Sequence, residues 1–124
     1  MAYTIRWANH GLIWTYSGVL TGEELIKSNL EIYGDARFSQ LYYQIVDLRM
    51  VREFKVLPEH MRRIAELDAA AYAVNRRIRV AVVTSEVTGA HMNRSYDQNS
   101  PEEHWETQVF RDYGKADEWT HELI

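Results

Sequence analysis

Ile78-Arg79-Val80-Ala81-Val82-Val83-Thr84 is a short and almost continuously apolar run, and it decides the fold class of this chain. Most of its residues are β-branched, and a run without polar alternation is typical of a strand buried on both faces of a parallel sheet. A stretch of strong helix formers precedes it, from Pro58 to about Asn75. A second β-prone run, Tyr43–Leu48, lies before that helix. The strand–helix–strand order predicts two parallel strands joined by a right-handed crossover.

The N-terminal residues carry the pattern of an antiparallel hairpin. Apolar and polar residues alternate from Tyr3 to Trp7, which is the period-two pattern of a half-buried strand. Leu12–Tyr16 is a second run of this type, and Ala8–Gly11 between the two has the composition of a turn. We therefore expect two antiparallel strands at one edge of the sheet.

Thr21 to Gly34 is predicted to form the first helix. Thr21 and Glu24 match a capping box, in which a hydroxyl and a carboxylate bond the free amides of the first turn. Gly34 is expected to end this helix in a left-handed conformation. A weaker helical pattern begins near Ser85 and fades by Asn99.

The C-terminal residues add one more strand and helix. Thr107–Phe110 reads as a short last strand, and Asp112 is placed to cap a final helix with Ala116, Trp119 and Leu123 on one side. The complete order is ββαβαβαβα. It predicts an α/β fold with a mostly parallel sheet of about five strands, an N-terminal antiparallel hairpin and four helices.

The composition narrows the class of protein. A length of 124 residues, 46% of them apolar, fits one domain over residues 1–124. The chain has no cysteine, which excludes disulfides, cysteine-ligated zinc and thiol catalysis. No run approaches the roughly 20 apolar residues that span a bilayer. The first residues do not resemble a signal peptide, so we expect no membrane span and a cytoplasmic location.

Charge and motifs indicate which activities to expect. The net charge of −4 argues against nucleic-acid binding. The five histidines show no metal-ligand spacing, and no nucleotide or hydrolase motif is present, so we expect no metal, no cofactor and no enzymatic activity. Residues 49–79 hold eight Arg and Lys against four Asp and Glu, whereas residues 97–124 hold two against eight. These blocks either neutralise each other within one chain or meet across a subunit boundary, where complementary patches orient association.

Four features, taken in order, resemble the SpoIIAA-like branch of the STAS domain family. They are the strand ending in Ile45–Arg49, the long helix from Pro58, the strand Val80–Thr84 before another helix, and Val109–Asp112 leading to Ala116-x-x-Trp119. The resemblance covers almost the whole chain and implies a β-α superhelix. It also implies non-enzymatic work: regulation through protein–protein contacts in the anti-sigma antagonists and, elsewhere, small-molecule sensing.

One departure from this family bears on mechanism. The anti-sigma antagonists that the chain resembles carry Asp-Ser-Ser or Asp-Ser-Thr at the start of the helix after the central strand, and that serine is phosphorylated. The matching stretch here, Val51-Arg52-Glu53-Phe54-Lys55-Val56-Leu57-Pro58, contains no hydroxyl residue. A phosphate switch adds charge at such a helix start. Partner switching by phosphorylation is therefore not expected, whereas phosphate-independent protein binding is.

Asp68 is the most informative anomaly in the sequence. It falls near the middle of an apolar stripe on the second helix, formed by Leu57, Met61, Ile64, Ala65, Ala71 and Tyr72. A carboxylate directed at a core must be paired, hydrogen-bonded or protonated. Asp68 therefore either lines a ligand pocket together with Tyr72 or ties down an Arg, a Tyr hydroxyl or loop amides. Asn29 interrupts the apolar face of the first helix in the same way, and the two side chains can share a polar contact if the helices are neighbours.

Polar residues also follow the central strands. Asp47 and Arg49 come at the end of one strand, and Thr84 and Ser85 at the end of the next. Ligands bind beyond the carboxyl ends of the strands in open parallel sheets, which makes these residues a candidate anion site. The alternative is ordinary helix capping and an Asp–Arg surface pair.

Four aromatic residues sit in weakly patterned segments: Tyr42, Tyr96, Trp105 and Tyr113. Tyr and Trp dominate the energetics of protein interfaces. We interpret the four as an oligomer or partner surface, with packing of loops as the alternative.

Two functions are compatible with these observations. The first is a non-enzymatic STAS-like interaction module that associates with itself or with another protein. The second is a carrier or sensor of a small apolar or amphipathic ligand held near Asp68. An enclosed apolar cavity reached by Asp68 or Tyr72 would favour the carrier. A tightly filled core with exposed aromatic residues would favour the interaction module.

Overall fold

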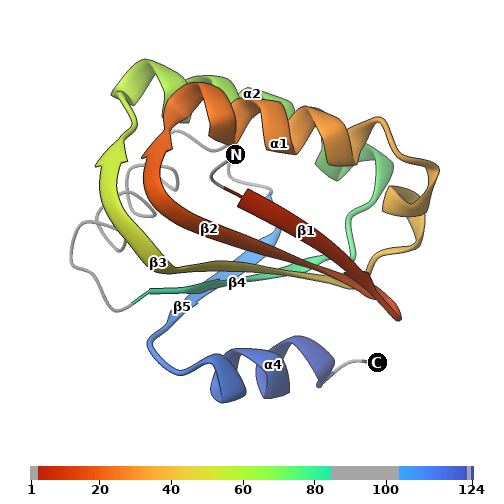
Figure 1. Ribbon diagram of the computed structural model, residues 1–124. Helices are drawn as coiled ribbons and strands as arrows, with labels where there is room; N and C mark the ends of the chain where they lie inside the picture. The colour runs from red at the N-terminus through yellow and green to blue at the C-terminus, as the bar shows by residue number, and fades with distance from the viewer. Residues whose placement is uncertain (1–2, 85–103, 123) are drawn as a thin grey trace.

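The computed structural model describes residues 3–84, 104–122 and 124 and contains a five-stranded sheet (Figure 1). Its strands are β1 (Tyr3–Ala8), β2 (Gly11–Thr21), β3 (Tyr43–Lys55), β4 (Arg79–Val83) and β5 (Glu106–Phe110), and they lie side by side in chain order. The first pair is antiparallel, and all later pairs are parallel. The predicted hairpin and the mostly parallel sheet are confirmed.

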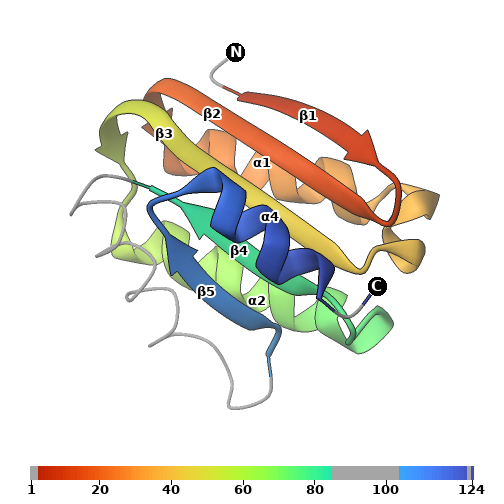
Figure 2. The same ribbon diagram turned by 90° about the horizontal axis from the view of Figure 1, so that it is seen from below.

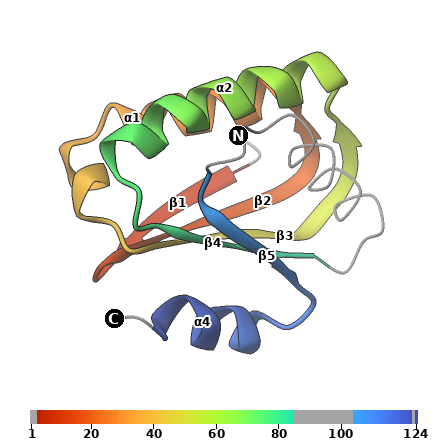
Figure 3. The same ribbon diagram turned by 180° about the vertical axis from the view of Figure 1, so that it is seen from behind.

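Helices cover both faces of this sheet. The helices α1 (Gly22–Tyr33) and α2 (Pro58–Val74) lie on one face, and α4 (Tyr113–His121) lies on the other (Figures 1 and 3). Seen from below, α4 crosses the middle of the sheet over β3 and β4 (Figure 2). The described residues thus contain three of the four expected helices, and the one expected between Ser85 and Asn99 lies outside them. In this part of the chain, no helix is long and apolar enough to cross a membrane.

The hairpin turns through two residues, Asn9 and His10. Ala8 pairs with Gly11 across the turn, and His10 takes a positive φ of 66°. Gly11 is required there because the ring of Tyr43 lies against it. A Cβ atom built on Gly11 would come within 2.0 Å of that ring.

The first helix begins and ends where predicted, but Gly34 at its end takes a different conformation from the expected one. The backbone amide of Glu24 donates to the hydroxyl of Thr21 over 3.2 Å, so Thr21 is the N-terminal cap. The expectation of a left-handed Gly34 is wrong, because its φ is −87°. The chain does not reverse at this point. It continues into a 3-10 helix, η1 (Ala36–Gln40), which Asp35 caps through the amide of Arg37.

The third strand is much longer than the expected Tyr43–Leu48. It continues to Lys55, almost to the start of the helix at Pro58, because β2 is itself eleven residues long and pairs with it as far as Thr21 and Lys55. Register shifts around Ser17 and Gly18 bend this two-stranded ribbon, and Gly18 has a φ of 68°. In Figure 1 the ends of both strands curve up toward the starts of α1 and α2.

The two faces of the sheet bury different residues. Toward α1 and α2 the strands present large rings, among them Trp14 and Tyr16. Toward α4 they present a more compact set, including Ile45, Ala81 and Val83, which are each 0% exposed. Residues alternate between the two sets, so β2, β3 and β4 are buried on both faces, as the apolar run from Ile78 predicts.

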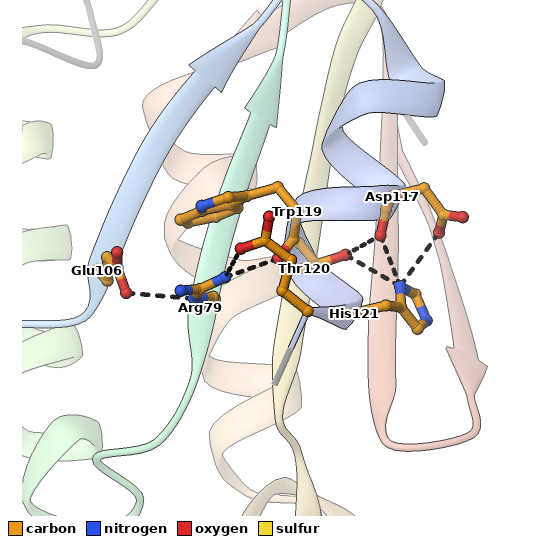
Figure 4. A network of polar contacts seen from close by, with 7 residues as sticks. Arg79, Glu106, Asp117, Trp119, Thr120 and His121 are labelled. Atoms are coloured by element: carbon orange, nitrogen blue, oxygen red, sulfur yellow. Dashed lines mark hydrogen bonds and ion pairs between the residues drawn. The ribbon is translucent and has the colours of Figure 1, made fainter. Parts of the chain in front are cut away.

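Arg79 ties α4 to the sheet (Figure 4). Its Nη1 donates to the backbone carbonyl of Trp119 over 2.8 Å and to Glu122 over 2.9 Å, and its Nε donates to Glu106 over 3.2 Å. The guanidinium also stacks on the ring of Trp119, 4.7 Å from its centroid. The bond to Glu122 raises the pKa of Arg79. These contacts join the basic and acidic blocks of the sequence within one chain.

Candidate ligand pocket

A pocket of about 100 Å³ lies between the sheet and the two helices α1 and α2. Its floor is formed by side chains that alternate along three strands: Trp14 and Tyr16, then Gln44, Val46 and Leu48, then Val80 and Val82. Its roof is formed by Leu25 and Asn29 of α1 and by Met61, Ile64 and Asp68 of α2. Trp105 and Thr107 close the side next to β5. Most of this lining is apolar.

Asp68 reaches this pocket from α2, where it is half-buried. One of its carboxylate oxygens accepts a hydrogen bond from the hydroxyl of Tyr33 on α1. The same hydroxyl lies 3.3 Å from Oδ1 of Asn29, whose Nδ2 donates to the carbonyl of Leu25 over 2.8 Å. The structure therefore brings Asn29 and Asp68 together through Tyr33. Asp68 bonds a Tyr hydroxyl, as one of the two expectations had it, and it also lines the pocket.

Two hydrogen-bond donors in the floor have no acceptor among the described residues. They are Nε1 of Trp14 and Nε2 of Gln44, and their residues are only 2% and 3% exposed. Buried donors of this kind are rare in native proteins. Sequence reasoning missed both residues. The available signal was the alternation of Tyr43–Leu48, which places the amide of Gln44 on the same face as Val46 and Leu48.

Two other polar groups of the lining are satisfied. The hydroxyls of Tyr16 and Ser28 lie 2.7 Å apart, and that of Ser28 donates to the carbonyl of Leu25. Burial raises the pKa of Tyr16, so its phenol is neutral at ordinary pH. The indole of Trp105 donates to the carbonyl of Asn75 over 2.7 Å. The donors of Trp14 and Gln44 therefore differ from the neighbouring polar groups, which have hydrogen-bond partners.

Tyr72 does not line the pocket. Its ring is half-buried, stands 6.4 Å from the ring of Trp105, and carries the guanidinium of Arg76 at 5.5 Å. Of the two residues proposed on the second helix, only Asp68 reaches the cavity.

The residues expected at the carboxyl ends of the strands lie away from the pocket, and Asp47 and Arg49 are not at a strand end, because β3 continues past them to Lys55. Asp47 accepts bonds from the backbone amide, Nε and Nη2 of Arg49 over 3.1, 3.0 and 2.8 Å. The bond to Asp47 raises the pKa of Arg49, whose guanidinium stacks on Tyr113. Thr84 is buried, and its amide donates to the carbonyl of Phe110 over 2.9 Å. Asp47 and Arg49 thus form the Asp–Arg pair of the second alternative, and Ser85 lies outside the described residues.

Of the four aromatic residues expected at an interface, the structure describes three, Tyr42, Trp105 and Tyr113, and these do not form one surface. Trp105 is 4% exposed and packs against the rings of Tyr33 and Phe38, so its assignment to an exposed surface is wrong. Its indole finds an acceptor inside the fold, which allows it to be buried. Tyr42 is half-buried between His10 and Arg77, Tyr113 is half-buried beneath Arg49, and Tyr96 lies outside the described residues.

Comparison with known proteins identifies the fold. No family model matches the chain, and no curated protein matches its sequence. Two solved structures are similar along nearly their whole length. An uncharacterised protein of the DUF3478 family with a SpoIIAA-like fold, from Shewanella loihica PV-4, shares 15% identity at a TM-score of 0.58, covering 96% of this chain and 92% of that one. The anti-sigma factor antagonist SpoIIAA in its unphosphorylated form shares 12% identity at a TM-score of 0.57, covering 97% and 99%. The chain therefore has the SpoIIAA-like fold that its sequence predicted.

Proposed function

We propose that this SpoIIAA-like chain is a non-enzymatic module that binds a small, largely apolar molecule between its sheet and the helices α1 and α2. The pocket of about 100 Å³ carries this proposal. An engineered apolar cavity of about 150 Å³ holds benzene in another protein. This pocket is smaller and partly open, so the ligand expected here is a small ring that need not be fully enclosed. Apolar walls with a few placed polar groups are typical of small-molecule sites.

The chemistry of the lining supports binding over catalysis. Asp68 is the carboxylate that lines the pocket, and it accepts a bond from Tyr33, a weak acid. Within residues 3–84 and 104–122, no three His, Asp or Glu side chains gather as a metal site would require.

A protein-binding role is the second candidate. It rests on the similarity to SpoIIAA, which is named as an anti-sigma factor antagonist. The end of the β2–β3 ribbon exposes apolar side chains, with Met50 64%, Leu57 51% and Val19 38% exposed. The corner between β3 and α2 has no hydroxyl to phosphorylate, so such binding would be independent of phosphate. The partner in this case is another cytoplasmic protein or a second copy of the chain, and sedimentation at micromolar concentration tests the latter.

Filling the pocket tests the ligand-binding proposal. Val80→Phe places a ring in the pocket, whereas Val109→Phe adds the same ring on the neighbouring edge strand, at a residue 36% exposed that does not line it. We expect toluene to perturb the methyl resonances of pocket residues in the wild type and in Val109→Phe, and not in Val80→Phe. Absence of any perturbation in the wild type, or equal perturbation in both variants, would contradict the proposal.

A further inference from the structure

We infer that the ligand of this pocket carries a neutral hydrogen-bond acceptor, a carbonyl oxygen of ketone, ester or amide type, that receives the N–H groups of Trp14 and Gln44. This inference rests on the proposed function and names the chemical class of its ligand. The evidence is the position of the two unpaired donors in the floor of the pocket.

The two donors belong to neighbouring strands and face the same side of the sheet. Gln44 on β3 pairs with Leu12 on β2, and Trp14 lies two residues further along β2, so their side chains are diagonal neighbours. Both line the same pocket. An indole nitrogen can only donate a hydrogen bond, and the Nε2 of a glutamine donates two. A single oxygen with two lone pairs can accept from both residues.

Leaving the two donors unpaired costs their full desolvation, because burial has removed water from them. The neighbouring polar groups show that this fold can satisfy buried donors. Trp105 lines the same pocket, and its indole donates to Asn75. Among the described residues the exception is confined to the floor, where Trp14 and Gln44 are 2% and 3% exposed. An acceptor supplied by a ligand accounts for this arrangement.

The charge of the lining decides between a neutral and an anionic acceptor. Among the residues that the structure describes, the pocket lining includes no Lys, Arg or His, and it includes Asp68. A buried carboxylate ligand would meet no cation among these residues, and burying an unpaired charge costs far more than burying a carbonyl. The apolar remainder of the ligand would contact side chains such as Val46, Val80 and Met61.

Two probes of equal size isolate the acceptor. Cyclohexanone and methylcyclohexane have the same number of heavy atoms, and only the ketone carries an acceptor. We expect cyclohexanone to shift the indole N–H resonance of Trp14 downfield, in the direction of a new hydrogen bond, and methylcyclohexane not to do so. Trp105 is the internal control, because its indole is already bonded to Asn75 and should show no comparable downfield shift.

Two variants test the donors one at a time. Trp14→Phe removes the indole N–H, and Gln44→Leu removes the whole amide group with both of its N–H bonds. Each variant leaves an apolar side chain of related shape. The affinity for cyclohexanone, divided by that for methylcyclohexane in the same variant, should fall about five- to tenfold per donor removed. The ratio cancels changes of pocket size that affect both probes. If Trp14→Phe fails to fold, the affinity ratio of Gln44→Leu and the Trp14 resonance of the wild type still test whether the ligand needs an acceptor.

The outcomes separate this inference from the proposed function. If both probes bind and neither variant changes the ratio, the acceptor is not required and this inference is overturned, while the apolar pocket stands. If neither probe nor toluene binds, both proposals fail. Tighter binding of cyclohexanecarboxylate than of cyclohexanone would overturn the assignment of a neutral ligand. A ratio that falls in both variants, with the shift at Trp14, supports the inference.

Discussion

The two faces of the sheet are packed in different ways, although the same strands supply both. The face under α4 is filled by larger side chains around two small residues, Ala81 and Ala116, which are both 0% exposed, and Arg79 bonds the last turn of that helix. The face under α1 and α2 combines large rings with a pocket and two donors that lack acceptors among the described residues. Proteins violate local packing and hydrogen-bonding rules mainly where they function, so the comparison points to the second face.

Side-chain size gives a physical reason for the difference. A helix comes close to a sheet where the contact residues are small, and Ala81 and Ala116 allow this for α4. Trp14, Tyr16 and Trp105 are bulky and have fixed shapes, so their rings leave gaps that neighbouring aliphatic side chains fill only in part. Adjacent residues of one strand therefore face different amounts of free space.

Enlarging two neighbouring residues of β4, one on each face, is the strongest test of the difference in packing between the two faces. Ala81→Leu adds three carbons beneath α4, where Ala81 and Ala116 are fully buried, and we expect the free energy of unfolding to fall by about 3 kcal/mol. Val80→Phe adds four carbons toward the pocket and should cost less than about 1 kcal/mol. Chemical denaturation of both variants gives the two values. Equal losses would show that the pocket face is as tightly packed as the other.

The dependence of stability on alkaline pH should report the burial of Tyr16 on the pocket face. Burial raises the pKa of Tyr16 above its ordinary value of 10.0. Below pH 10 the phenol is neutral in both the folded and the unfolded chain, so the free energy of unfolding does not depend on its titration. Above pH 10 the free energy of unfolding falls, because the unfolded chain releases a proton that the folded chain retains. Above pH 10 the wild type should lose about 1.4 kcal/mol per pH unit more than Tyr16→Phe. Denaturation at several pH values measures both slopes, and parallel slopes would contradict the burial of this phenol.

Loosening α4 should affect only its own face. Arg79→Ala removes the bonds to Trp119 and Glu122 together with the stacking on the indole, and we expect a loss of about 1 kcal/mol because the carboxylates are exposed and can be solvated again. Hydrogen exchange should accelerate in α4 and stay unchanged in α1 and α2. Glu106→Gln is the matched control and should change stability by less than about 0.5 kcal/mol. Faster exchange throughout the chain would contradict a local role.

The smallest expected effect has the opposite sign. Gln44→Leu removes a buried donor that has no acceptor in the described structure, so the free energy of unfolding without ligand should stay equal or rise by up to about 1 kcal/mol. Asn75→Leu is the contrast, because Nδ2 of Asn75 donates to the carbonyls of Phe38 and Leu41 and its loss should destabilise. Thermal unfolding of both variants provides the measurement. A clear loss in Gln44→Leu would show that this amide supports the fold itself.

Local patterns predicted the elements whose cause is local. The alternation from Tyr3, the hydroxyl of Thr21 and the carboxylate of Asp112 act within a few residues, and each element begins where they predict. The predictions that failed depend on distant partners. The strand β3 continues to Lys55 because β2 pairs with it, and Trp105 is buried because Asn75, thirty positions away, accepts its N–H group.

In the candidate site, too, the residues with a local cause were predicted and those that depend on distant partners were not. The sequence identified Asn29 and Asp68 as polar residues on apolar helix faces, because helical periodicity alone places them there. It did not identify Tyr33, which connects them, or the unpaired donors of Trp14 and Gln44.

By itself, the sequence determined the order of the described strands and helices, the hairpin and the helix starts, since these follow from periodicity and short-range hydrogen bonds. Its resemblance to the SpoIIAA-like proteins implied the fold class. Only the tertiary structure decided that α1 and α2 leave a pocket above the sheet and that the ring of Trp105 is buried in the core. It also decided that two donors in the floor of the pocket have no acceptor in the described part of the chain. Space and hydrogen-bond satisfaction are properties of all surrounding residues together, and no single stretch of sequence contains them.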